Sequence, residues 1–417
     1  MLNNYICALD IGSSKLCASL FQFKGKRCRA AFFESIPLKG VSEGVVVDAT
    51  ELVNTVTKLI KNLKSRSRIN VKNIYANISG QDILTKHSRS IMPLAERGNK
   101  VIARSDIHKV IEQAHILGSS LDEEIIHQIP LSFNIDSKSG VTSPLGLYSH
   151  RLEVDLFLIC AKLSAFQSLC RAIGQSGCEL RGVFFSGLAS SRAAMDDNFK
   201  EGLNLFCDAG ADMTELLLFK NGVLSGVNIL QMGGNDFTAR LAEELKIPFE
   251  LAEDIKKTYG LVGDSAQLTD DKEILIKKSD LYKPIKQKLV AGIVTQQAKE
   301  FCAKLKEQIA KVAASYEVNN LIIAGRSVLL EGFIETLENE LNIRVKLARL
   351  SNKNIPLLAK EDNALSGQRY LAYLTSIGVI CEVMDGDSGL IEAKANPSGN
   401  IFVSTFNKIK EVYQEYF

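Results

Sequence analysis

Apolar runs and helically spaced apolar positions alternate along the N-terminal part of the chain. The runs at 5–10 and 16–23 flank a turn, and the segment at 30–36 extends them into a meander. Within 48–66 the apolar residues recur three and four positions apart, which predicts an amphipathic helix, and a strand is expected at 72–79. This order predicts an α/β fold.

The pattern of the N-terminal hairpin occurs twice. YICALDIGSSKLCASLFQFKG (5–25) and LNLFCDAGADMTELLLFKNG (203–222) each contain a strand, Asp-x-Gly, a few small or polar residues and a second apolar strand. A tight turn alone explains either hairpin, because Asp and Gly favour turns. Two matching hairpins, each at the start of one half of the chain, indicate an internal duplication.

The segments around the second hairpin fit this division. Residues 82–162 alternate short strand and helix signals, so we expect an inserted module there. After the second hairpin come a glycine pair before a helix, a helix at 249–260, and a strand, glycine turn and amphipathic helix at 319–341. These last segments belong to the second half.

The composition limits the class of protein. At 417 residues the chain exceeds one hydrophobic core, so two or more domains are expected. A net charge of +2 gives no reason to expect nucleic acid as a partner. Nine scattered cysteines without a C-x-x-C pair predict reduced thiols, and the five histidines lack metal-ligand spacing. No apolar run is long enough to span a membrane.

The two Asp-x-Gly turns are candidates for one phosphate site. Backbone N–H groups, hydroxyls and a Lys suit a polyphosphate, and Asp10 and Asp208 would share the shell of a Mg²⁺ ion through water. The N–H groups of the glycine pair, at a helix start, would be free to meet phosphate. Glu253 and Lys256 lie three apart on one helix face. They could line the same site, but a solvated ion pair alone also explains their spacing.

Five segments carry a resemblance to a known family: DIGSSK (10–15), NIYANISG (73–80), HQIPLSFNIDSKSGVTSPLGLYSHRLEVDLFLI (127–159), FFSGLASSRAAM (184–195) and AEDIKK (252–257). Taken in their order along the chain, these segments resemble the actin–Hsp70–sugar kinase superfamily of ATPases. Within it they resemble the FtsA family, which tethers FtsZ to the membrane in bacterial cell division. The inserted module weighs most, because it separates FtsA from Hsp70, MreB and the sugar kinases.

The resemblance implies an actin-like two-lobed ATPase fold, made of duplicated RNase H-like domains with an FtsA-type inserted subdomain and a C-terminal amphipathic helix. The implied division is lobe 1 from 1–81, 163–202 and 360–384, the inserted subdomain 82–162, the lobe 2 core from 203–240 and 301–359, a subdomain at 241–300, a linker at 385–400 and the helix 401–417.

The resemblance also implies a site for ATP and Mg²⁺. Asp10 and Asp208 would hold the metal, the hydroxyls and Lys of the first turn would contact the β- and γ-phosphates, and Glu253 and Lys256 would hold the ribose. The implied nucleotide-contacting residues are Asp10, Gly12, Ser13, Ser14, Lys15, Asp208, Gly210, Asp212, Thr214, Gly233, Gly234, Asn235, Glu253, Lys256, Gly325, Arg326 and Ser327.

The chain departs from the family pattern at the phosphates and at the adenine. Ala211 and Asp212 replace two glycines of the second phosphate motif, which limits close approach of the backbone, and a carboxylate at 212 would repel a triphosphate unless a metal intervenes. Arg326 replaces a glycine of the adenosine motif and would stack on adenine or fill its place. Segment 286–301 lacks the Arg-rich helix of the FtsZ-binding subdomain. We expect ATP binding with weak or absent hydrolysis.

The C-terminal residues predict a membrane anchor. A polar linker at 385–400 precedes apolar residues spaced three and four apart, as in an interfacial helix. FtsA-like proteins carry a membrane-targeting helix here, whereas a terminal helix docked on the body is the alternative. Lys408 and Lys410 are matched by Glu411 and Glu415, so apolar insertion must carry the affinity. The membrane-facing residues are Phe402, Phe406, Ile409, Tyr413, Tyr416 and Phe417.

The resemblance therefore implies a cell-division scaffold at the cytoplasmic face of the membrane. It would polymerise head to tail and link FtsZ and other division proteins to the membrane at the division site. A small-molecule kinase of the same superfamily and a pilus-assembly ATPase-like adaptor are the alternatives.

Overall fold

The computed structural model describes residues 5–385 apart from 25–26, 96–97, 137, 197–198, 200, 264–272, 279–280, 314–316 and 351–362. The helix expected at 401–417, its six membrane-facing residues and the linker from 386 onward lie outside the described residues. Within the described part, no helix has the length and apolar character needed to cross a membrane.

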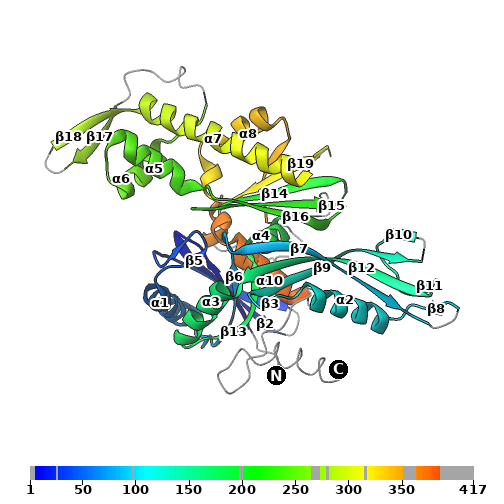
Figure 1. Ribbon diagram of the computed structural model, residues 1–417. Coiled ribbons are helices and arrows are strands. Elements are labelled where there is room, and N and C mark those ends of the chain that lie inside the picture. Colours follow the sequence, from blue (N-terminus) through cyan, green and yellow to red (C-terminus); the bar gives the residue numbers. More distant parts are fainter. Residues whose placement is uncertain are drawn as a thin grey trace.

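The first lobe is built on a five-stranded mixed sheet in the order β13-β6-β1-β2-β3. One pair of helices, α1 with α3, packs on one face of this sheet, and α4 with α10 packs on the other (Figure 1). The strands are β1 (Tyr5–Ile11), β2 (Lys15–Lys24), β3 (Arg27–Pro37), β6 (Asn73–Ile78) and β13 (Glu179–Phe185). The helices are α1 (Ala49–Ser67), α3 (Leu163–Gln175), α4 (Ser186–Ala194) and α10 (Leu374–Asp385).

The second lobe repeats this sheet in the order β16-β15-β14-β19-β20. Its strands are β14 (Leu203–Ala209), β15 (Thr214–Lys220), β16 (Val223–Leu230), β19 (Asn320–Ala324) and β20 (Val345–Leu347). Its helices are α5 (Gly234–Leu245), α6 (Phe249–Tyr259), α7 (Gln287–Ala313) and α8 (Phe333–Leu341), and β17 (Glu273–Lys278) pairs with β18 (Leu281–Lys286).

The inserted module follows β6 and has its own core. Its four-stranded sheet has the order β10-β9-β12-β7, and α2 packs on β7 and β12 (Figure 1). The elements are β7 (Ile83–Pro93), β8 (Lys100–Val101), α2 (Arg104–Gly118), β9 (Glu123–Ile135), β10 (Lys138–Val141), β11 (Tyr148–Ser149) and β12 (Arg151–Lys162).

The remaining short elements are β4 (Val41–Ser42), β5 (Val45–Val46), η3 (Ser327–Leu329), η4 (Asn363–Leu365) and η5 (Arg369–Ala372). The domain boundaries given above stay a prediction.

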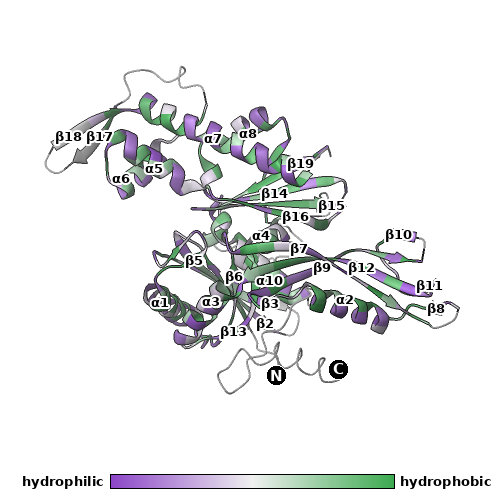
Figure 2. Ribbon diagram, in the orientation of Figure 1, coloured by the Kyte–Doolittle hydropathy of each residue, from purple (hydrophilic) through white to green (hydrophobic). Residues whose placement is uncertain are grey.

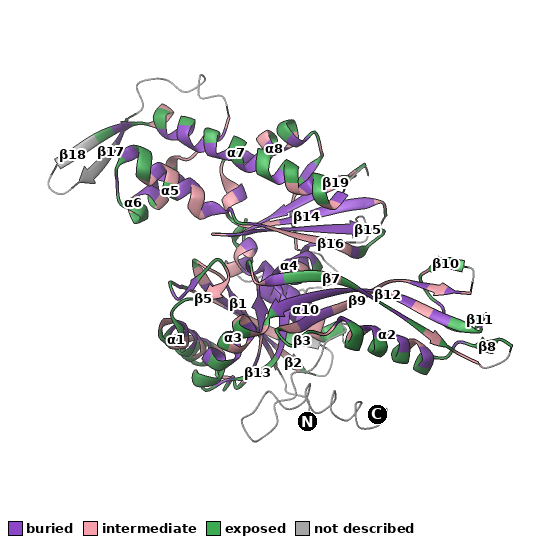
Figure 3. Ribbon diagram, viewed as in Figure 1, coloured by how far each residue is buried: buried purple, intermediate pink, exposed green. Residues whose placement is uncertain are grey.

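The apolar pattern accounts for the layers. The central strands of both lobe sheets are apolar and buried (Figures 2 and 3). The helix predicted at 48–66 is confirmed as α1, which buries Leu52, Val56 and Leu59 against the sheet. The Asp48 side chain accepts a hydrogen bond from the Glu51 N–H at 3.0 Å and so caps the first turn.

The internal duplication is confirmed in atomic detail. The two hairpins pair with the same register, because Asp10 lies opposite Cys17 and Asp208 lies opposite Glu215. Each hairpin closes through the same turn contact: the Gly12 N–H donates to the Lys15 carbonyl at 3.0 Å, and the Gly210 N–H donates to the Met213 carbonyl at 2.9 Å.

Several contacts attach the inserted module to the first lobe, and two of them involve Gly44 and His127. Gly44, in the β4–β5 turn (φ 77°), packs on the root of the module so closely that a Cβ there would lie 2.4 Å from the Ser79 carbonyl oxygen. On β9, the His127 ring accepts a hydrogen bond at 2.9 Å from the N–H of Phe185, the residue before α4. Burial lowers the pKa of His127 to about 4, so the ring is a neutral acceptor.

Several hydrogen bonds join the two lobes beside the hairpin turns. The Glu43 N–H donates to the Asp212 carboxylate at 3.0 Å, and the Gln231 side-chain amide donates to Gln81 at 2.7 Å. Between them the Ser79 hydroxyl donates to Glu215, whose side chain is buried. Burial raises the pKa of Glu215 to about 8 despite the Ser79 hydrogen bond.

This buried carboxyl makes stability depend on pH. The folded pKa of Glu215 lies above its unfolded value, so the folded state binds the proton more tightly. Stability from this group is therefore complete at low pH and is lost as the pH rises from about 4.5 to about 8. Glu215→Gln should remove that loss, with a free energy of unfolding at pH 8 higher than the parent's by an amount on the order of a few kcal/mol.

Urea unfolding of both proteins across this pH range measures the difference. Glu317→Gln, at an exposed position, is the matched control and should follow the parent curve. Parallel pH profiles for parent and Glu215→Gln would contradict the assignment of the buried proton to this side chain.

Candidate functional site

A cleft of about 420 Å³ lies between the turns of the two duplicated hairpins. Residues of both turns line it, together with the starts of α5 and η3, part of α6, and Thr375 at the start of α10. All but two of the residues predicted to contact a nucleotide line this cleft; the exceptions are Thr214 and Gly233. The fold therefore gathers segments from the two halves of the chain at one site.

The two exceptions serve the local structure. The Thr214 hydroxyl is buried and donates to the Met232 carbonyl at 2.7 Å, so it is used inside the second lobe. The Gly233 N–H donates to the Asp236 carboxylate at 2.7 Å, which caps α5.

The expectation of free N–H groups at the start of α5 is wrong. The Gly234 N–H donates to the Gly210 carbonyl at 2.9 Å, and the Asn235 N–H donates to the Ala211 carbonyl at 2.7 Å. The reason is packing: the second hairpin turn lies directly against the helix start, where a Cβ on Gly233 would lie 2.5 Å from the Ala211 carbonyl oxygen. These glycines allow close approach between protein segments.

Asn77 holds the first carboxylate of the cleft. Its side-chain N–H₂ donates to Asp10 at 3.0 Å and to the Ser186 hydroxyl at 2.8 Å, while its carbonyl accepts from the Ile11 N–H at 2.6 Å. One amide thus ties β6 to β1 and to the start of α4. The Asp10 side chain is consequently fixed in orientation before any ligand arrives.

Ser190 on α4 holds the second carboxylate, donating to Asp208 at 2.7 Å. Burial raises the pKa of Asp10 to about 6 and also raises that of Asp208, and the positive charge of Lys15 opposes both shifts. The Asp208 charge raises the pKa of Asp10 further, so the two carboxylates repel one another. A cation between them would relieve this repulsion.

The donor set fits a divalent cation that keeps water or phosphate ligands. Among the described residues, no group of three or more His, Cys, Asp or Glu side chains is arranged to hold a metal. Asp10 and Asp208 can supply two hard oxygen donors, and Mg²⁺ commonly takes one or two carboxylates and completes its shell with water and phosphate oxygens.

Lys15 and Arg326 are two of the four cationic residues that line the cleft. The Lys15 ammonium donates to the Ala372 carbonyl at 2.6 Å, which leaves two of its three N–H groups for a ligand. Arg326, expected at the adenine, lines the cleft with an exposed side chain. Gly325 before it has φ 95° and lies so close to Ala209 that only glycine fits.

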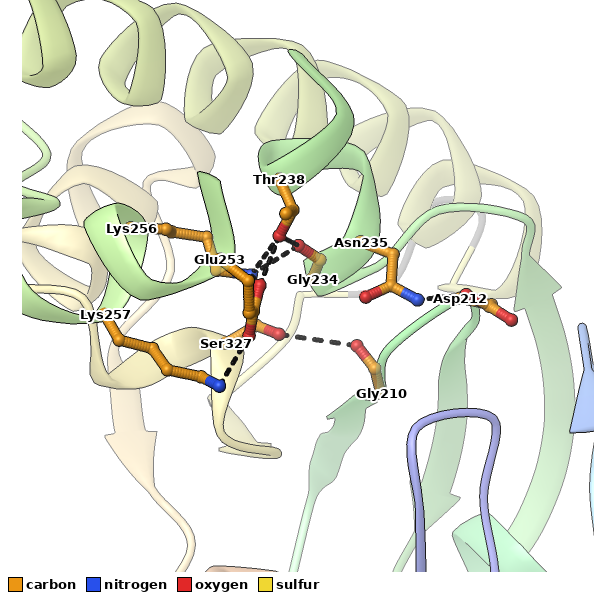
Figure 4. Close-up of polar contacts among 9 residues, drawn as sticks. All are labelled: Gly210, Asp212, Gly234, Asn235, Thr238, Glu253, Lys256, Lys257 and Ser327. Carbon is orange, nitrogen blue, oxygen red and sulfur yellow. Dashed lines mark hydrogen bonds and ion pairs between the residues drawn. The ribbon is translucent and has the colours of Figure 1, made fainter. Parts of the chain in front are cut away.

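Glu253 and Lys256 do not form a solvated ion pair. Lys256 is buried, and its three N–H groups reach the Gly234 carbonyl at 2.7 Å, the Thr238 hydroxyl at 2.7 Å and Glu253 at 2.6 Å (Figure 4). Burial opposes the charge of Glu253, but Lys256 and its other donors outweigh it and lower the pKa of Glu253 to about 2. Lys256 thus has no donor left for a ribose.

Asp212 does not point freely at the cleft. Its carboxylate accepts a hydrogen bond at 2.6 Å from the side chain of Asn235 (Figure 4) and one from the Glu43 N–H of the first lobe. The side chain that replaces a glycine in the second phosphate motif therefore joins the two lobes.

The sequence-based prediction missed several residues of this cleft. Asn77 and Ser79 lie in the quoted segment 73–80, and polar residues at the end of a buried strand were a usable signal. Lys257, next to the predicted Lys256, contacts Glu253 at 3.1 Å and lines the cleft. The missed lining residues with polar side chains are Asn77, Ser79, Ser186, Glu215, Lys257 and Thr375.

Two family models match the chain. One, described as the SHS2 domain inserted in FtsA, matches residues 80–160, and the other, cell division protein FtsA, matches residues 205–378. Together they match more than half of the chain.

Curated relatives of the same name match it along most of its length. The FtsA of Borreliella burgdorferi is 24% identical over 351 residues, which are 83% of this chain and 85% of the relative. The FtsA of Agrobacterium fabrum is 24% identical over 420 residues, which cover 96% of this chain and 93% of the relative.

Solved structures support the fold. A PilM–PilN type IV pilus biogenesis complex aligns with TM-score 0.60 and 15% identity, covering 90% of this chain and 98% of that chain. MreB5 of Spiroplasma citri bound to ADP aligns with TM-score 0.51 and 11% identity, covering 92% of this chain and 99% of that chain. The two-lobed, duplicated architecture is thus the actin-like ATPase fold with the FtsA-type inserted domain, and the chain belongs to the FtsA family of cell-division proteins.

Proposed function

We propose that this protein is a cell-division scaffold that binds ATP and Mg²⁺, polymerises head to tail, and tethers FtsZ filaments to the cytoplasmic face of the membrane through its C-terminal helix. The observation that carries the proposal is the cleft between the duplicated hairpins, in a chain of the FtsA family. A site between two lobes suits a ligand that fixes their relative position.

The cleft residues divide into a phosphate end and a nucleoside end. Asp10 and Asp208 would hold Mg²⁺ through water, and Ser13, Ser14 and the free N–H groups of Lys15 would contact the phosphates. Since the Lys256 ammonium is fully used, Glu253 and Lys257 are left to bind the ribose. Gly325, Arg326 and Ser327 would face the adenine.

Asp212 disfavours the close approach of a triphosphate that turnover needs. Its negative charge lies at the phosphate end, where it opposes a further anion. The hydrogen bond that it accepts from the Glu43 N–H joins the lobes, and the one from Asn235 holds the carboxylate within the second lobe. We therefore propose a scaffold whose ATP turnover is weak or absent.

Two other functions are alternatives for a chain with this fold. A small-molecule kinase would turn over ATP only when a metabolite is added. A pilus-assembly adaptor would assemble with a different partner; the likeness to PilM extends to the fold alone. Neither alternative gives the C-terminal helix its proposed role at a membrane.

Replacing Asp10 with Asn should weaken Mg²⁺-dependent ATP binding roughly tenfold or more, because it removes one of two charges that hold the metal. Binding by the parent should also decline as the pH falls below about 6, where protons compete for Asp10. Fluorescence anisotropy of a labelled ATP analogue, with and without Mg²⁺, measures both effects. Asp254→Asn, exposed on α6 and outside the cleft lining, is the control; equal Mg²⁺-dependent affinity for Asp10→Asn would refute the metal assignment.

Replacing Asp212 with Gly should tighten ATP binding by roughly tenfold, since the repelling charge and its side chain are both removed. Asp212→Asn separates the two causes, because it keeps the size of the side chain and removes the charge. The same anisotropy titration applies. If neither variant binds ATP more tightly than the parent, Asp212 does not oppose the phosphates.

Deleting residues 401–417 should abolish membrane binding. The full chain should pellet with lipid vesicles and carry FtsZ with it, whereas residues 1–400 should stay in the supernatant and leave FtsZ there. Pelleting of the truncated chain, or a full chain that stays soluble, rules out the helix as the tether. Pelleting without recruitment of FtsZ would keep the anchor and remove FtsZ as the partner.

A further inference from the structure

Cations gather at the end of the first lobe that lies away from the cleft. Lys61 and Lys64 lie in the C-terminal part of α1, and Arg68 and Lys72 follow it. All four are exposed. Among the described residues, none of the four has an ion-pair partner.

Three acidic residues of the first lobe already pair with arginines. Glu34 pairs with Arg66 at 2.9 Å, Glu179 pairs with Arg181 at 3.1 Å, and Asp385 pairs with Arg192. The four unpaired cations therefore act as a local positive charge on a chain whose net charge is only +2. We call Lys61, Lys64, Arg68 and Lys72 the cationic end.

The course of the chain sends α10 toward the same end. Ser186 at the start of α4 and Thr375 near the start of α10 both line the cleft. The two helices pack on each other and run away from the cleft until Asp385 meets Arg192. β6 likewise starts at the far end, where the Lys72 N–H donates to Tyr5 at the start of β1. Asp385, after which the described structure stops, and the cationic end thus share one end of the lobe.

We propose that the cationic end contacts anionic lipid headgroups and supplies the electrostatic attraction that the C-terminal helix lacks; this rests on the membrane tether proposed above. The helix expected at 401–417 has matched Lys and Glu residues, so its own attraction to an anionic surface is weak. The linker that the composition predicts for 385–400 would have a root-mean-square span of roughly 20 Å, so the end of the lobe would reach the surface that the helix binds. Lysines must come within about a Debye length, roughly 8 Å, to gain from that surface.

A membrane explains the pattern better than an acidic protein segment. The four cations are exposed on the C-terminal part of a helix and on the loop after it, and none of them lines the cleft between the lobes. A planar anionic surface needs no such groove, and each Lys or Arg adds to the attraction independently.

The test compares binding of the full chain to two vesicle types. One type is phosphatidylcholine alone, and the other contains equal amounts of phosphatidylcholine and phosphatidylglycerol. The variant Lys61→Gln, Lys64→Gln, Lys72→Gln removes three exposed charges and leaves Arg68, which has a positive φ, in place. The matched control, Lys299→Gln, Lys304→Gln, Lys311→Gln, removes three charges from α7 of the second lobe. Thermal unfolding of both variants verifies that the fold is kept.

We expect the first variant to bind the anionic vesicles at least tenfold more weakly than the control, and both to bind the neutral vesicles like the parent. Equal binding of the two variants to anionic vesicles would overturn the inference while leaving the C-terminal tether intact. A parent chain that binds neither vesicle type would overturn the tether, and this inference with it.

Discussion

Two partly buried carboxylates that repel one another are the constraint around which this fold is arranged. Asp10 and Asp208 end the first strand of each duplicated hairpin, and the architecture brings them to one cleft. Removing both from water is unfavourable unless hydrogen bonds and cations compensate. Asn77 and Ser190 provide those hydrogen bonds, and Lys15 provides the charge. The arrangement has the chemistry of a site awaiting a cation with its own anionic ligand.

Local patterns sufficed to predict the layers and the main segments of the cleft. The helical spacing of apolar residues predicted α1 within about one residue at each end, and the repeated Asp-x-Gly turn indicated the duplication. Both are properties of contiguous segments, so the sequence contains the whole signal.

What the sequence did not contain was the partner of each polar group. Glycines before a helix predict exposed N–H groups only if nothing else packs there, and the carbonyls of Gly210 and Ala211 accept them here. Lys256 had the spacing of a surface ion pair but is buried under α5, where its donors are used. Such pairings depend on which segments meet in space. That is decided by the packing of both lobes together.

The attachments of the inserted module at Gly44 and His127 connect it to both sides of the cleft. Ser79, beneath the Gly44 contact, reaches Glu215 on the second lobe, while His127 holds the start of α4, whose Ser190 holds Asp208. A change in the tilt of the module would therefore displace residues that line both sides of the cleft. A ligand of the cleft and a partner of the module that favour different tilts would then change each other's affinity by the same factor.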